Sequence, residues 1–192
     1  MDGLAEWFRY NGERSWWWVL SGGLFCWILG LKEPSLAYWT ISMTPKSGEQ
    51  FEKDRFNLQR FVEAQNSLYE EVLAELRSGV KRTHWIWFIF PQIEGLGLSA
   101  TARKFAISSL AEAEGYVKHP VLGPRLRQCT GLVNLVQHRS VEQIFGYPDK
   151  LKFRSSMTLF ARATADNGIF NEALQKYFEG KPDPCTIERL GE

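Results

Sequence analysis

Residues 57–77 read NLQRFVEAQNSLYEEVLAELR and show the most regular pattern of the chain. Apolar residues recur there every three or four positions, which is the spacing of one face of an α-helix. Gly79, just past the pattern, is expected to end this helix in the left-handed conformation. The remaining positions are polar and are predicted to face water. The apolar face is Leu58, Phe61, Val62, Leu68, Tyr69, Val72, Leu73 and Leu76, and the polar face is Gln59, Arg60, Glu63, Gln65, Glu70, Glu71 and Glu75.

Further helices are predicted from capping signals and apolar spacing downstream. Apolar residues repeat at helical spacing over 122–136 and 170–178, and the second of these stretches is stopped by Gly180 and Pro182. A serine followed three residues later by Glu or Gln has the pattern of a capping box. The predicted starts are Ser99 for residues 100–108, Ser109 with Glu112, Ser140 with Gln143, and Asp149 for residues 150–164.

The run Trp85-Ile86-Trp87-Phe88-Ile89-Phe90 is ambiguous, because aromatic and β-branched residues favour a strand whereas a short apolar run is equally typical of a buried helix. No partner strand is visible elsewhere and the neighbouring segments are all predicted to be helical. We therefore interpret it as a buried helix that begins at Thr83 and ends before Pro91. The fold class predicted for residues 54–190 is all-α, a compact single-domain helical bundle.

Composition limits the function classes. The chain has 192 residues, 44% of them hydrophobic, with 23 Lys and Arg against 22 Asp and Glu. This balance excludes a disordered chain and argues against nucleic-acid binding, which needs an excess of positive charge. Three widely spaced cysteines give no disulfide framework and fit a reducing compartment, so we expect a cytoplasmic protein. No metal site is predicted, because the three histidines lie tens of residues apart.

Residues 1–50 differ in composition from the rest of the chain, since six of the eight tryptophans fall before residue 40. Four interpretations stay open for this extension. It is a segment that the native protein lacks or does not need, with the functional start at Met43, or it is a membrane anchor through the uncharged residues 15–31. Otherwise it is a signal peptide, or a helix docked on the domain. No stable membrane insertion is expected for residues 43–192.

The order and spacing of several motifs resemble the domain-of-unknown-function 1810 family. The resemblance covers residues 54–190, and its ending short of residues 1–50 supports a start near Met43. It implies a small, mainly α-helical, intracellular protein and no established reaction. Members are often labelled calpastatin-like, but this chain lacks the disordered repeats that a calpain inhibitor would need. The motifs are 56–65, 81–92 with 95–97, 119–126, 144–146 with Asp149 and Lys152, and 155–160.

Two motifs combine cationic, aromatic and hydroxyl side chains and form the candidate site. In the first, Lys81 and His84 stand beside aromatic residues, a combination suited to a planar or phosphorylated ligand. The second motif is residues 149–158. In the simpler interpretation the tryptophans are core residues, and the hydroxyls of the second motif bond to the backbone of their own helix. The candidate ligand-binding residues are Lys81, Trp85, Trp87, Gln92, Lys152, Ser155, Ser156 and Thr158, and the candidate catalytic residue is His84.

Three functions are compatible with these residues. The first is a binding module for a small anionic or nucleotide-like ligand, with the two motifs around a shared pocket. The second is a hydrolase for a phosphorylated or ribosyl substrate, with His84 as acid or base close to Ser155 or Ser156. The third is a protein–protein interaction domain. No cofactor is predicted, and both the presence of an enzyme activity and the oligomeric state stay open.

Overall fold

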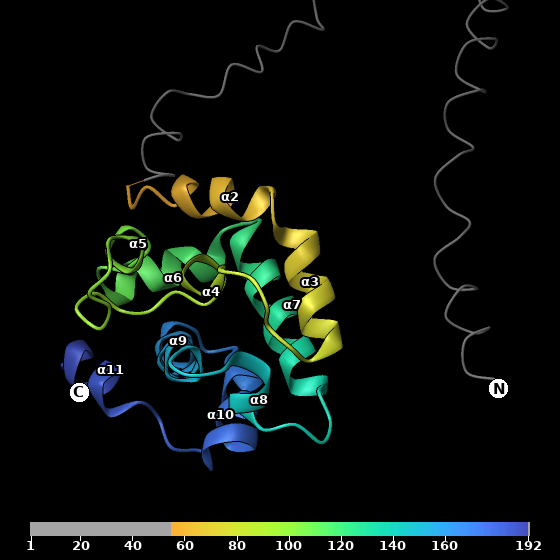
Figure 1. The fold of residues 1–192 in the computed structure, drawn as a ribbon. Coiled ribbons are helices and arrows are strands. Elements are labelled where there is room, and N and C mark those ends of the chain that lie inside the picture. Colours follow the sequence, from red (N-terminus) through yellow and green to blue (C-terminus); the bar gives the residue numbers. More distant parts are fainter. Residues whose placement is uncertain (1–54, 192) are drawn as a thin grey trace, which may run out of the picture. The chain divides into compact units, whose positions relative to one another are not determined.

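The computed structural model describes residues 55–191, which form helices and no strand ladder (Figure 1). The predictions made for residues 1–50 lie outside this part of the chain. None of the helices in the described part is long and apolar enough to cross a bilayer. The helices are α2 (Gln59–Asn66), α3 (Tyr69–Ser78), α4 (Ile86–Ile89), α5 (Ala100–Lys104), α6 (Leu110–Lys118), α7 (Leu122–Leu135), α8 (Val141–Phe145), α9 (Asp149–Ala163), α10 (Gly168–Phe178) and α11 (Pro184–Leu190).

The single helix predicted over 57–77 is wrong in one respect, because the chain breaks it into α2 and α3 at Ser67 and Leu68. Leu68 leaves the helical region with φ −121° and ψ −4°, and the two helices then run in different directions (Figure 1). Periodicity cannot reveal this bend, because the apolar positions on both sides of it are buried. Gly79 ends α3 as predicted, with φ 68°.

The aromatic run at 85–90 is helical, as predicted, but shorter than expected. Only Ile86–Ile89 form α4, and Trp85 and Phe90 flank this single turn with non-helical dihedral angles. The chain then runs extended, and Ile93 and Ile107 form an isolated parallel bridge. Such a bridge gives the two segments backbone partners without building a sheet.

Helix α9 lies at the centre of the described domain and packs against α4, α6, α8, α10 and α11. Its residues Phe153 and Phe160 are fully buried. The ring of Phe153 stacks on Phe145 of α8 at 4.8 Å and meets Phe90, after α4, edge-on at 4.9 Å. Aromatic rings therefore join the end of α4, α8 and α9 in one core.

Local capping agrees with the sequence at some helix starts and differs at others. Ser140 and Gln143 form the predicted reciprocal capping box, and Ser99 caps α5, which ends at Lys104 rather than near residue 108. Ser109 caps α6, but the Glu112 carboxylate bonds to Ser108 instead of completing a box. The remaining differences are that Asp149 is the first residue of α9 rather than its cap, and that α11, with Asp183 as N-cap, was not predicted.

Candidate functional site

One buried carboxylate, that of Glu75 in α3, holds the loop that carries the first candidate motif. Glu75 accepts hydrogen bonds from the backbone amides of Arg82 at 2.8 Å and Thr83 at 3.0 Å. The Thr83 hydroxyl and the Trp85 indole N–H each donate to it at 2.8 Å. Burial alone would raise the pKa of Glu75, but these hydrogen bonds outweigh burial and lower it. A single ionised side chain therefore holds the backbone amides of Arg82 and Thr83.

Lys81 and Lys152 meet on the same carboxylate. Their ammonium groups lie 2.7 Å from the two different oxygens of Asp149. Burial would raise the pKa of Asp149, but the hydrogen bonds from Lys152 and Lys81 outweigh this and lower it. Two ammonium groups thus share one carboxylate, which leaves this cluster with one positive charge in excess.

The lysine pair is partly shielded from water by indole rings. The side chains of Lys81 and Lys152 are 7% and 18% exposed. The Lys81 ammonium lies 5.4 Å from the ring centroid of Trp85, and that of Lys152 lies 4.6 Å from the centroid of Trp87. Trp85 is fully buried, whereas Trp87 is half-buried and keeps part of its surface open to solvent. The Coulomb attraction between a cation and an anion is stronger where the cation is partly withdrawn from water than where it is fully solvated.

The candidate hydroxyls of α9 serve mainly to anchor the C-terminal segment. Ser155 donates to the Asp183 carboxylate at 2.9 Å, and the Thr158 hydroxyl accepts from the Asp183 amide at 2.8 Å. Ser156 is fully buried, and its hydroxyl has no hydrogen-bond partner within residues 55–191. Ser155 and Thr158 therefore position the start of α11 rather than a ligand.

The two remaining candidates are more open to solvent. Gln92 is half-buried, and its backbone carbonyl accepts a hydrogen bond from the backbone amide of Ile107 at 2.8 Å. His84 is exposed and makes no hydrogen bond with any residue between 55 and 191. The structure accordingly gathers Lys81, Trp87 and Lys152 around Asp149, and it does not join His84 to Ser155 or Ser156.

Comparison with known proteins agrees with this architecture. The family model described as "Protein of unknown function (DUF1810)" matches residues 55–190. The chain belongs to this family. It is also similar to a solved structure, the conserved hypothetical protein Rv1873 from Mycobacterium tuberculosis, with 56% sequence identity and a TM-score of 0.71. That match covers 71% of this chain and 98% of the Rv1873 chain. Among curated proteins, none matches the chain significantly.

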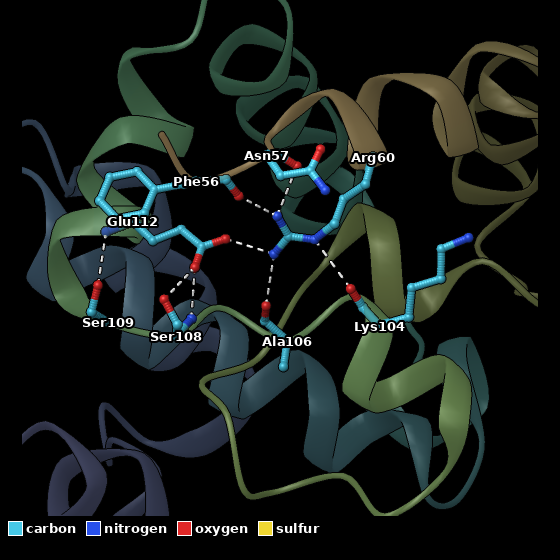
Figure 2. A network of polar contacts seen from close by, with 8 residues as sticks. All are labelled: Phe56, Asn57, Arg60, Lys104, Ala106, Ser108, Ser109 and Glu112. Atoms are coloured by element: carbon cyan, nitrogen blue, oxygen red, sulfur yellow. Dashed lines mark hydrogen bonds and ion pairs between the residues drawn. The ribbon is translucent and has the colours of Figure 1, made fainter. Parts of the chain in front are cut away.

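The DUF1810 domain contains a second charged network, which sequence reasoning missed because Arg60 was assigned to the water-facing side of its helix. Figure 2 shows the Arg60 guanidinium at the centre of this network, paired with the Glu112 carboxylate at 2.6 Å. Glu112 also accepts from the Ser108 amide and hydroxyl, at 2.8 and 2.7 Å. The other acceptors of the guanidinium are the backbone carbonyls of Phe56, Asn57, Lys104 and Ala106.

Gln65 is a further buried polar residue of the same helix. Its amide nitrogen donates to the Phe88 carbonyl at 2.7 Å and lies 3.0 Å from the Tyr116 hydroxyl. The sequence did contain a signal that Gln65 and Glu75 would be buried. Gln65 and Glu75 lie three or four residues from apolar neighbours such as Phe61 and Val72, so both stand on the apolar stripe itself.

The side chains that could bind a metal ion lie apart from one another in the described part of the molecule. Within residues 55–191, no three His, Cys, Asp or Glu side chains gather closely enough to hold a metal ion. Cys129 is fully buried, and burial raises the pKa of its thiol to about 12, so it remains protonated at neutral pH.

Proposed function

We propose that the domain is a binding module for a small anionic ligand, phosphate-bearing or nucleotide-like, which it holds at the lysine pair. The observation that carries the proposal is the sharing of one carboxylate, that of Asp149, by the ammonium groups of Lys81 and Lys152. One positive charge stays uncompensated at a place that is largely withdrawn from water. Holding an unpaired charge there is costly, and an anion that completes the pairing is stabilised.

The half-buried indole of Trp87 supports the nucleotide-like variant of this proposal. Its ring lies beside the Lys152 ammonium, with 4.6 Å between the nitrogen and the ring centroid. A ligand that joins a phosphate to a flat ring can place the phosphate on the lysines and the ring on the remaining indole surface.

Calorimetry and thermal unfolding of the full chain, at constant ionic strength, test the proposal with inorganic phosphate and AMP as probes. Binding stabilises the folded state by ~2.7 kcal/mol at a hundredfold excess over the dissociation constant, which thermal unfolding detects. Lys152→Ala should abolish the stabilisation by inorganic phosphate. Lys118→Ala, at a lysine that is 75% exposed and pairs with Glu114, is the matched control and should bind as the wild type does.

Asp149→Asn separates a ligand site from a purely structural ion pair. If the cluster is structural, this variant is simply less stable. If it is an anion site, the variant loses stability without ligand but gains more from phosphate than the wild type does, because two unpaired ammonium groups then face the anion. Unchanged probe binding in Lys152→Ala, or no stabilisation of Asp149→Asn by phosphate, contradicts the proposal. An advantage of AMP over phosphate that disappears in Trp87→Leu would identify the ring contact.

A further inference from the structure

A cavity of about 480 Å³ opens over the Arg60 network, between the start of α2, the end of α5 and the turn before α6. Its size falls within the range of ~300–1,000 Å³ that is typical of small-molecule sites. None of the candidate site residues predicted from the sequence lines it. We refer to it as the α2–α5 cavity.

The floor of the α2–α5 cavity is rigid and electrically neutral. Arg60 and Glu112 both line it and neutralise each other at 2.6 Å. The guanidinium also donates to four backbone carbonyls, so it has no donor directed at a ligand (Figure 2). Asn57, in the wall, has a left-handed backbone with φ 51°, and its carbonyl is one of those acceptors. A ligand can therefore bind above Arg60 and Glu112 without moving either side chain.

The rim of the cavity carries an excess of positive charge. Arg55, Arg103 and Lys104 line it, and none of them is paired with a carboxylate within residues 55–191. Glu94 is the one other acidic residue among the lining side chains. Three cations against one carboxylate leave two positive charges above a neutral floor. A ligand with two negative charges on one group would balance them.

An aromatic ring forms part of the same wall. Phe56 is half-buried and lines the cavity, and the Arg55 guanidinium lies 4.6 Å from the centroid of its ring. The cavity thus offers an apolar face next to its cations. This pairing suits an organic phosphate better than a bare inorganic ion, because the organic part covers the ring while the phosphate meets the cations.

We propose that the α2–α5 cavity is a second ligand site, which takes the dianionic phosphate of a small organic phosphate ester. A phosphate monoester carries close to two charges at neutral pH. Arg55, Arg103 and Lys104 supply the positive charge, and Phe56 supplies the apolar face. This site shares no residue with the lysine pair and stands or falls independently of it.

Phenyl phosphate is the probe, titrated into the full chain by calorimetry at pH 7.5 and constant ionic strength, with amide chemical-shift mapping. Benzenesulfonate, which has the same ring and one charge, is the matched ligand control. We expect phenyl phosphate to bind and to shift the amides of Asn57, Lys104 and Ser108, which line the cavity. Arg103→Ala and Lys104→Ala should each weaken binding about fivefold, and Glu94→Gln should tighten it by a similar factor.

Arg77→Ala is the matched protein control, because Arg77 is an exposed basic residue in the last turn of α3, outside the cavity lining. It should leave the affinity unchanged, and Lys152→Ala should leave the shifts of the cavity amides unchanged, which separates this site from the lysine pair. The inference is overturned if phenyl phosphate does not bind, if benzenesulfonate binds equally well, or if the Arg103→Ala/Lys104→Ala double variant keeps the wild-type affinity. Shifts confined to amides away from the cavity would overturn it as well.

Discussion

The indole N–H of Trp85 donates to the Glu75 carboxylate at 2.8 Å, and both side chains are buried. This contact joins α3 to the residue that precedes α4, ten positions further along the chain. It explains why a tryptophan next to a cationic loop lies inside the molecule. The polar edge of the ring is satisfied by the same carboxylate that fixes the loop backbone.

Glu75→Gln should lower the free energy of unfolding by about 2 to 3 kcal/mol. The variant replaces a charged acceptor of several hydrogen bonds with a neutral amide whose NH₂ group faces donors. Urea unfolding followed by circular dichroism measures the loss. Glu71→Gln, at an exposed position of the same helix, should change it by less than ~0.5 kcal/mol. An equal loss of unfolding free energy in both variants would show that the hydrogen bonds of Glu75 do not stabilise the domain.

Stability should also depend on pH through Glu75. Its pKa in the folded protein lies below the ordinary value of 4.5, so the folded state binds its proton less readily than the unfolded state does. The contribution is therefore fully present above pH 4.5 and is lost as the pH falls through the lowered pKa. Urea unfolding between pH 3 and 7 should show a steeper loss below 4.5 for the wild type than for Glu75→Gln. Parallel profiles would contradict this assignment.

Arg60→Lys should destabilise the domain by about 2 kcal/mol, although the charge is retained. An ammonium group cannot reproduce the fork that pairs with Glu112 and reaches four carbonyls from one plane. Arg77→Lys, at an exposed arginine of α3, serves as the control and should be nearly neutral. A double-mutant cycle with Glu112→Gln should give a coupling above ~1 kcal/mol, and additive effects would argue against a direct interaction.

Two glycines of α7 should respond in opposite ways to alanine. A Cβ at Gly123 would lie 2.0 Å from the carbonyl oxygen of Val117, so the end of α6 would have to move, at a cost of ~1–3 kcal/mol. A Cβ at Gly131 would meet only Ile169, at an ordinary 3.5 Å. Gly131→Ala should therefore be neutral or stabilising by up to ~1 kcal/mol, because alanine favours the helix. Thermal unfolding of both variants tests this, and a harmless Gly123→Ala would show that the contact is not tight.

The helical class of the domain, most of its helix starts and the burial of residues 85–90 other than Trp87 could be predicted from local pattern. Capping serines act on amides two or three residues away, and an apolar stripe reflects burial along one helix. Such signals need no knowledge of the rest of the chain. For the same reason they gave no warning of the bend at Leu68, where both halves of the stripe are buried in different directions.

The partners of the charged groups in the site could not be predicted from local pattern. The sequence by itself predicted that residues 54–190 would be helical and that Lys81 and Lys152 were candidates for binding. Only the tertiary structure decided that both lysines meet on Asp149, that Glu75 holds the loop and that Arg60 pairs with Glu112, 52 positions away. The partner of a buried charge is set by which helices pack together. That choice depends on side chains distributed over the whole core and leaves no pattern near either residue.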